Sequence, residues 1–315
     1  MTHHSGMSPP KNSPRQVNDK FGVSFSLKQC RNFGLAWQTV LEASLNDLGV
    51  RRFRLMSYWN EHEHERGVFD FTDLDKQIDM IEQAGGIVTL CLGARQPRWP
   101  ESHWPDWAWD LSKEERTTEL MKFVQAIVER YRNRSCIISW QLENEALLER
   151  WGDKGEVDRK RLRTEYKLVK RLDPTRPVVM TTSTSWGIPI RRPIPDIVGF
   201  SYYRTLYRDG AYHRSLYYPW VFKLRALLIR LLHWKPTFIH EMQAEPWGPK
   251  NIWEMSPEEQ DKSMSIEQLR QNIALAQKTR LYPIDLWGVE WWYWLRANHN
   301  DPSKWNIVKQ LFTVE

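Results

Sequence analysis

The alternation of short apolar runs with helical periodicity is the feature that most restricts the fold of this chain. Eight runs are typical of buried strands, and between them apolar positions recur at helical spacing. We therefore predict an α/β fold in which eight strand–helix units close into one (β/α)8 TIM barrel. No GxGxxG motif follows the first run, which disfavours an open dinucleotide-binding sheet. The expected strands cover residues 21–26, 50–56, 87–92, 136–138 with the residues leading to Glu145, 178–182, 197–203, 237–241 and 284–292.

Length and composition favour a single domain. The chain has 315 residues, of which 41% are hydrophobic, and this is enough for one large core. We expect a disordered polar tail over residues 1–19 and one catalytic barrel over residues 20–315. The tail holds no apolar segment of the signal-peptide or anchor type, so a cytoplasmic location is the default expectation. A native leader removed from the chain would instead mean secretion.

The charge and the cysteines exclude several function classes. The net charge is +6, but Lys and Arg are dispersed among nearly as many acids, which indicates a solvated surface and no nucleic-acid partner. Cys30, Cys91 and Cys136 are odd in number and lack CxxC spacing, so we interpret them as reduced packing residues. We expect neither a metal nor an organic cofactor.

Two acids at predicted strand ends are the main candidates for chemistry. Glu145 follows the fourth strand and Glu241 ends the seventh. In an eight-stranded barrel these strands face each other, and side chains at carboxyl ends converge at the mouth. Two carboxyl groups about 5 to 5.5 Å apart can hydrolyse a glycosidic bond with retention of configuration. The 18 Trp residues include more than a core needs, and indoles are suitable platforms for sugar rings.

These residues resemble a known group of enzymes. The Asn144-Glu145 pair and Glu241 resemble the acid/base and nucleophile of clan A of the retaining glycoside hydrolases, over essentially the whole barrel. The sequence Gln-Leu-Glu-Asn-Glu at 141–145 is similar to the beta-galactosidase families thirty-five and forty-two, as is the stretch at 63–71. Arg54 on the second strand and an aromatic residue ending the eighth resemble the cellulase-like family five.

The resemblance implies a role for each residue of the pair and for its neighbours. Glu145 is expected to be the general acid/base and Glu241 the nucleophile, whereas a surface acid and a salt-bridged acid are the alternatives. Asn144 is expected to hydrogen-bond the sugar 2-hydroxyl. Arg54 is expected to hold the charge of Glu241, or else to form a structural salt bridge.

Further candidates for substrate binding lie near the same strand ends. Tyr203 is expected to orient Glu241, and Tyr202 is the alternative because neighbouring strand residues point to opposite faces. Others either contact sugar or brace their own loops, and one aromatic residue of the last strand should form the floor beside the scissile bond. These candidates are Gln243, Glu245, Trp247, Trp291, Trp292, Trp294 and Trp99.

We therefore predict a retaining glycoside hydrolase that cleaves β-linked sugars in an oligo- or polysaccharide by double displacement, similar to a beta-galactosidase or a β-1,4-glycanase. An inactive barrel that binds carbohydrate is the alternative. The sugar, the linkage and exo or endo action stay open, because loop contacts decide them. A monomer and a homodimer are both compatible with the sequence.

One segment does not follow from this prediction. Residues 216–234 are apolar on most sides and are interrupted by Lys223, Arg225 and Arg230. These charges argue against a helix that spans a membrane. The alternatives are a barrel helix with one buried face, a dimer interface, or peripheral contact with an anionic membrane.

Overall fold

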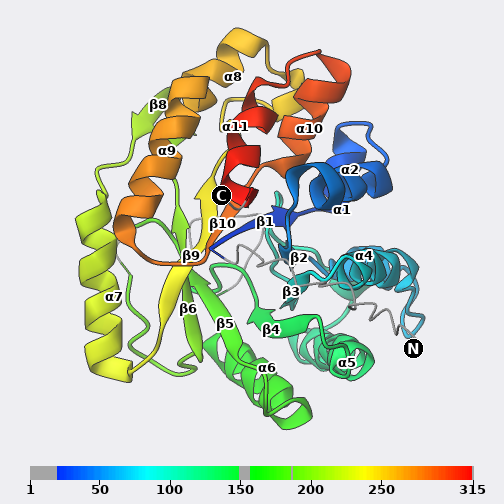
Figure 1. Cartoon of the computed structure of the whole chain (residues 1–315). Coiled ribbons are helices and arrows are strands. Elements are labelled where there is room, and N and C mark those ends of the chain that lie inside the picture. The colour runs from blue at the N-terminus through cyan, green and yellow to red at the C-terminus, as the bar shows by residue number, and fades with distance from the viewer. Residues whose placement is uncertain (1–19, 149–156, 186, 314–315) are drawn as a thin grey trace, which may run out of the picture.

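Eight parallel strands form a closed barrel in the computed structural model, which describes residues 20–148, 157–185 and 187–313. Their order around the barrel is β1, β10, β9, β6, β5, β4, β3, β2, so the first strand pairs with the last (Figure 1). The predicted TIM barrel is confirmed. The strands are β1 (Phe21–Phe25), β2 (Arg52–Leu55), β3 (Ile87–Leu92), β4 (Ile137–Leu142), β5 (Val178–Thr182), β6 (Ile197–Tyr202), β9 (Thr237–Gln243) and β10 (Ile284–Trp287).

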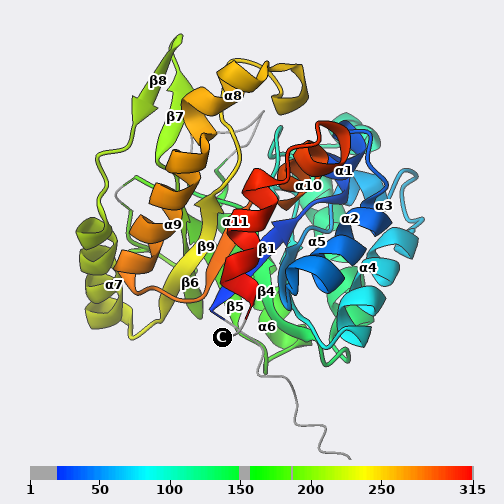
Figure 2. The same ribbon diagram turned by 45° about the horizontal axis from the view of Figure 1, so that its top comes forward.

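Helices cover the outer wall of the barrel (Figures 1 and 2). An antiparallel hairpin of β7 (Thr205–Arg208) and β8 (Ala211–Arg214) follows β6 and stands beside α8 at one end of the barrel, at the top of Figure 2. The helical segments are α1 (Leu27–Asn32), α2 (Trp37–Ala43), η1 (Ser44–Leu48), α3 (Trp59–His62), α4 (Thr72–Gln83), η2 (Asp106–Asp110), α5 (Lys113–Tyr131), α6 (Arg159–Leu172), α7 (Pro219–His233), η3 (Ile252–Glu254), α8 (Pro257–Met264), α9 (Ile266–Thr279), α10 (Val289–Asn298) and α11 (Ser303–Phe312).

Alternation along the strands sorts side chains between the barrel interior and the layer beneath the helices. On β2, Phe53 and Leu55 belong to the hydrophobic core, whereas Arg54 reaches Gln141 of β4 and Glu241 of β9. Neither β4 nor β9 is adjacent to β2, so these contacts cross the interior. The period of two along each strand therefore delivers the polar residues to the mouth of the barrel.

The last strand is shorter than the sequence predicts. The run at 284–292 is apolar apart from Asp285, Gly288 and Glu290, but β10 ends at Trp287 and α10 begins at Val289. Gly288 lies between them with φ of 140°, which a residue with a side chain rarely adopts. A Cβ there would lie 2.8 Å from the backbone oxygen of Ala244. The prediction of one strand over the whole run is therefore wrong.

Three further predictions concern the segment at 216–234, the N-terminal tail and membrane-spanning helices. The barrel helix considered for residues 216–234 is present and begins at Pro219. Part of the chain before it forms the hairpin, which the sequence analysis did not predict. The expected tail at 1–19 lies outside the described residues. Among the helices that the structure describes, none is both long and apolar enough to cross a membrane.

Candidate active site

The end of β4 is held in an unusual backbone conformation that presents three polar residues in succession. Glu143 and Glu145 have φ of 52° and 43°, in the left-handed region that costs roughly 1–3 kcal/mol for a residue with a side chain. The backbone N–H of Glu145 donates to Thr181 Oγ1 at 2.7 Å, and that hydroxyl donates to Asn144 Oδ1 at 3.0 Å. β5 thus fixes the turn that ends β4.

Glu143 acts as a brace for this turn. Its carboxylate accepts the backbone N–H groups of Ala94 at 3.2 Å and of Arg95 at 2.6 Å, in the loop after β3. The loop can approach this closely because residue 93 is glycine, where a Cβ would lie 2.7 Å from the Glu143 carboxyl. Glu143 is therefore bound to backbone and is not a competitor for the role of Glu145.

Glu241 lies between a cation and a phenol. The buried Arg54 guanidinium forms an ion pair with Glu241 Oε2, and the Tyr203 hydroxyl donates to Oε1 at 2.7 Å. Arg54 also donates from Nε to Gln141 Oε1 at 2.7 Å and from Nη2 to Asn144 Oδ1 at 2.9 Å. One guanidinium thus ties β2 to the ends of β4 and β9, so the positions of Asn144 and Glu241 depend on each other.

Glu145 has a different environment. Its Oε1 accepts a hydrogen bond from Ser201 Oγ at 2.6 Å, and the part of the structure described gives it no ion pair. Burial and the nearby charge of Glu241 raise the pKa of Glu145 to about 7. A carboxyl group with this pKa can hold a proton near neutral pH and release it in a reaction.

A third carboxyl group, which the sequence analysis missed, lies at the same place. Glu101 is 9% exposed and accepts a hydrogen bond from Asn144 Nδ2 at 2.9 Å. Burial, followed by the charge of Glu241, raises its pKa to about 8. It belongs to the long loop between β3 and η2 and has φ of 70°. No strand periodicity leads to this position, so the sequence gives no signal for it.

Two hollows meet at these carboxyl groups. The larger has a volume of about 830 Å³ and the smaller about 210 Å³. Glu101, Tyr203, Glu241 and Trp247 line both, while Glu145 lines only the smaller one. The pair predicted from the sequence is therefore brought together in one concave site, with space on either side of Glu241.

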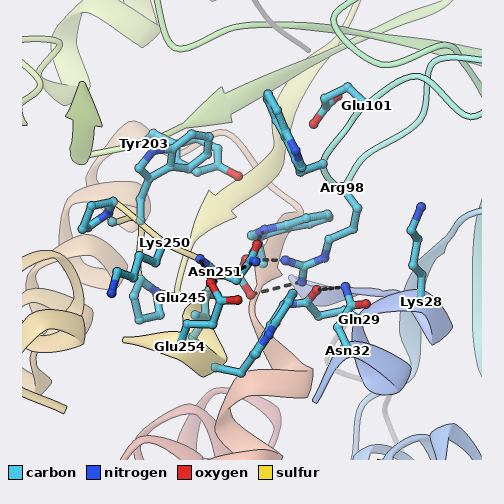
Figure 3. Close-up of a pocket in the computed structure, with 18 of the residues that line it drawn as sticks. Lys28, Gln29, Asn32, Arg98, Glu101, Tyr203, Glu245, Lys250, Asn251 and Glu254 are labelled. Atoms are coloured by element: carbon cyan, nitrogen blue, oxygen red, sulfur yellow. Dashed lines mark hydrogen bonds and ion pairs between the residues drawn. The ribbon is translucent and has the colours of Figure 1, made fainter. Parts of the chain in front are cut away.

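The larger hollow has aromatic and charged walls. Figure 3 shows Lys28 and Asn32 of α1 on the opposite side from Lys250 and Asn251. Arg98 crosses its floor, where its guanidinium carbon lies 4.1 Å from the centre of the Trp287 ring. Arg98 also forms ion pairs with the carboxylates of Glu245 and, at 3.1 Å, Glu290. These contacts join the loop after β3 to the ends of β9 and β10.

The smaller hollow is bounded by the hairpin and the turn after β5. Leu206, Tyr207 and Arg208 of β7 form one wall, and Ser183 and its neighbours form another. The hairpin, absent from the predicted barrel, thus shapes the space beside Glu145.

Among the predicted binding residues, the two tyrosines are separated as strand alternation requires. Tyr203 points into the site, whereas Tyr202 is fully buried and its ring lies 4.8 Å from that of Phe222 under α7. The alternative that placed Tyr202 in the site is wrong. Gln243 is also fully buried, and its amide bonds with the backbone of Arg204 and Thr205, so it braces the loop after β6.

The tryptophans predicted to close the last strand do not reach the site. Trp291, Trp292 and Trp294 lie on α10 because the chain turns into a helix at Gly288. The indole N–H groups of Trp291 and Trp292 donate to Gln260 and to the Ala244 backbone, so these rings are part of the structural core. Trp287, at the end of β10, takes the position expected of them.

The loop residues divide between site and packing. Trp99 is 66% exposed and lines the larger hollow, as do Glu245 and Trp247. In contrast, Trp107 donates its indole N–H to the Glu63 backbone at 2.9 Å, and Trp104 packs on Trp59. Among the residues described, no group of three or more His, Cys, Asp or Glu side chains is placed to hold a metal.

Comparisons with known proteins agree with this geometry. A family model described as "Glycosyl hydrolases family 2, TIM barrel domain" matches residues 93–221, and one described as "Beta-galactosidase" matches residues 36–119. The barrel, its strand-end acids and these matches, each of which covers less than half of the chain, support a place for this chain among the clan A glycoside hydrolases.

Individual relatives are more distant. The beta-galactosidase BgaH of Haloferax lucentense is 25% identical over 127 residues, which are 35% of this chain and 19% of that protein. The beta-galactosidase Bga of Halorubrum lacusprofundi is 26% identical over 121 residues, or 33% of this chain and 17% of that protein. The alignments thus span less than a fifth of either curated relative.

Solved structures share the fold. The beta-galactosidase structure from Halorubrum lacusprofundi has a TM-score of 0.56 at 16% identity and covers 85% of this chain and 52% of that one. A GH5_18 protein from Streptomyces cattleya in complex with GlcNAc has a TM-score of 0.59 at 13% identity, covering 85% and 70%. The exo-beta-1,4-mannosidase Op5Man5 from Opitutaceae bacterium strain TAV5 has a TM-score of 0.58 at 14%, covering 85% and 51%.

Proposed function

We propose that residues 20–315 form one catalytic domain that hydrolyses β-linked glycosides with retention of configuration, using Glu241 as nucleophile and Glu145 as acid/base. The observation that carries this proposal is the contrast between the two carboxyl groups of the smaller hollow. Glu241 is paired with the Arg54 cation, whereas Glu145 has a pKa raised to about 7. One group is thus suited to attack as an anion and the other to donate a proton.

The reaction follows from these two states. The Glu241 carboxylate attacks the anomeric carbon while the proton of Glu145 passes to the departing glycosidic oxygen, which gives a glycosyl ester and a free alcohol. The Glu145 carboxylate then takes a proton from water, and the water oxygen displaces Glu241 from the anomeric carbon. Two inversions give net retention, and both carboxyl groups return to their starting states.

In this proposal Asn144 and Glu101 bind the sugar near its 2-hydroxyl. The Asn144 side-chain oxygen accepts hydrogen bonds from Arg54 and Thr181, which turns its amide nitrogen towards Glu101. An amide nitrogen carries two hydrogens, so one stays available after the bond to Glu101. The glycone occupies the larger hollow over Trp287, and the leaving group occupies the smaller hollow beside Glu145.

The names of the relatives suggest which substrates to test. Beta-galactosidases and an exo-beta-1,4-mannosidase occur among them, so β-galactosides, β-mannosides and β-1,4-glycans are the first candidates. We propose a β-linked oligo- or polysaccharide as the substrate class. A panel of aryl β-glycosides and polysaccharides, with the product anomer followed by NMR, identifies the sugar and tests retention.

Two variants separate the roles of the carboxyl groups. Glu241→Gln should abolish turnover of every aryl glycoside. Glu145→Gln should still release dinitrophenol from a dinitrophenyl glycoside in a single burst, because this leaving group needs no proton, and should then stall as the glycosyl-enzyme. Steady turnover by Glu241→Gln would contradict the proposal. Glycan binding by the wild-type protein without hydrolysis of any substrate would instead favour a carbohydrate-binding barrel.

A further inference from the structure

Exposed apolar side chains are concentrated around α7. In the part of the chain that the structure describes, thirteen large hydrophobic side chains are exposed, and eight of them lie between residues 216 and 234. Isolated exposed hydrophobic residues are normal on a protein surface, but a contiguous set marks an interaction surface. The eight are Leu216, Tyr218, Trp220, Leu224, Leu227, Leu231, Leu232 and Trp234.

Trp220, Leu224, Leu227 and Leu231 form a line along α7, and Trp234 follows directly after the last helical residue. We call these five residues the α7 stripe. Steps of four and three residues keep side chains on one face of a helix, and the stripe extends over roughly 21 Å. Its members are 64%, 39%, 52%, 65% and 83% exposed, respectively.

The stripe is additional to the face that α7 uses in the fold. Val221, Phe222, Arg225 and Ile229 are buried against the barrel, and the Phe222 ring lies 4.8 Å from that of Tyr202. Figure 1 shows α7 at the outer edge of the molecule, and no residue of α7 lines either hollow of the active site. The α7 stripe therefore serves neither the barrel core nor the candidate active site.

The charged side chains beside the α7 stripe are positive. The sequence contains no Asp or Glu between Asp209 and Glu241. Lys223 and Arg230 are exposed, each one position before a leucine of the stripe, and neither forms an ion pair in the described part of the structure. The neighbouring α9 contains a single acid, Glu267, in its first turn. The stripe is thus flanked by uncompensated positive charge.

We propose that the α7 stripe binds an anionic lipid surface, with α7 lying in the plane of the membrane interface. Apolar residues enter the acyl boundary, Trp220 and Trp234 lie at the headgroup level at either end, and Lys223 and Arg230 meet lipid phosphates. A second copy of the chain fits less well, because pairing two stripes would bring lysine and arginine together without an acid to balance them.

Flotation of the full chain with lipid vesicles tests this proposal. The protein should float with vesicles of phosphatidylcholine mixed with phosphatidylglycerol, less with phosphatidylcholine alone, and less at high salt. Replacing two stripe leucines, Leu227→Asp with Leu231→Asp, should abolish binding. Neutralising the flanks, Lys223→Gln with Arg230→Gln, should weaken binding to anionic vesicles roughly thirtyfold and affect neutral vesicles little.

A control variant tests whether the loss of vesicle binding is specific to the α7 stripe or follows from any exposed apolar residue being replaced by Asp. Val68 is 60% exposed and lies between α3 and α4, outside the α7 stripe. Val68→Asp should bind vesicles as the wild type does. The thermal unfolding of all variants should match that of the wild type, because every changed side chain is exposed.

Three outcomes would overturn the proposal. Wild-type protein that stays at the bottom of the gradient with anionic vesicles would do so. Equal flotation of the Leu227→Asp, Leu231→Asp variant would show that another surface binds lipid. A wild-type dimer in light scattering that this variant converts to a monomer, without vesicle binding, would assign the stripe to a second copy.

Discussion

Three carboxyl groups meet at the mouth of the barrel, and their partners divide them into two kinds. Glu241 is paired with the Arg54 guanidinium, whereas in the described part of the chain Glu145 and Glu101 accept hydrogen bonds from the neutral side chains of Ser201 and Asn144. Burial without a cation favours the protonated form, and the charge of Glu241 acts in the same direction. Near neutral pH the site can therefore hold one anion and two acids.

The proton on Glu145 predicts how the rate depends on pH. For an alkyl β-glycoside, whose leaving oxygen needs a proton, kcat/KM should fall as the pH rises through about 7. For a dinitrophenyl glycoside of the same sugar this alkaline decline should be absent or shifted upward. Profiles of kcat/KM for both substrates provide the check, and identical declines would argue against Glu145 as the acid.

Glu101 predicts a difference between two substitutions. Glutamine at this position keeps a neutral group that can accept the hydrogen bond from Asn144, so Glu101→Gln should stay within a few-fold of wild-type activity below pH 7. Glu101→Ala removes the partner of Asn144 and should lower kcat/KM by roughly tenfold or more. Kinetics at pH 6 compare the two, and equal losses would show that the carboxyl group itself is needed.

Sequence patterns could locate only those residues whose side-chain direction a strand determines. Glu145 and Glu241 follow apolar runs, and Arg54 was expected from the family resemblance. Strand alternation implied that one of Tyr202 and Tyr203 points into the site, without deciding which. Glu101 lies in a loop with φ of 70°, so its direction depends on local turns and not on periodicity. Loop geometry is also why the packing of Trp104 and the exposure of Trp99 could not be told apart in advance.

At the scale of elements, alternation predicted the strand–helix units and failed where a mainly apolar run passes from a strand directly into a helix. Over 284–292 the mainly apolar sequence is compatible with both a strand and a helix, and Gly288 is a local sign of the change between them. The β7–β8 hairpin was missed for a related reason, since its residues are largely exposed and carry no core pattern.

Gly288 predicts a specific loss of stability. In Gly288→Ala the new methyl group would meet the Ala244 backbone and force an unfavourable φ, at a cost of about 3 kcal/mol. Gly34→Ala is the matched control, because φ there is 68° and no atom lies within 4 Å, so about 1 kcal/mol is expected. Urea unfolding measures both. Equal costs would mean that the turn after β10 adapts.

At the scale of the whole molecule, buried acids predict a decline of stability with pH. The pKa of Glu101 is raised to about 8, and those of Glu145 and Glu290 to about 7, in each case first by burial. Between about pH 6.5 and 8 the folded chain therefore binds more protons than the unfolded chain, in which these acids are ionised. The free energy of unfolding should fall across this window by an amount on the order of 3 kcal/mol.

Buried histidines make the free energy of unfolding rise with pH, but in a lower pH range than the carboxyl groups. Burial lowers the pKa of His240 to about 4 and that of His103 to about 3, so their contribution to stability is complete above about pH 6.5. Urea titrations at pH 6.5 and pH 8 isolate the carboxyl groups, and Glu101→Gln should reduce the difference. Stability that is constant or rising over this interval would contradict the assignment.

The pairing of β1 with β10 has a consequence for how the chain is made. A ribosome delivers Ile284–Trp287 roughly 260 residues after Phe21–Phe25, yet these strands are neighbours in the finished wall. At about 5–20 residues per second, β1 waits many seconds with one row of N–H and C=O groups unmatched. Until Ile284–Trp287 arrives, that row is a template for pairing with other chains.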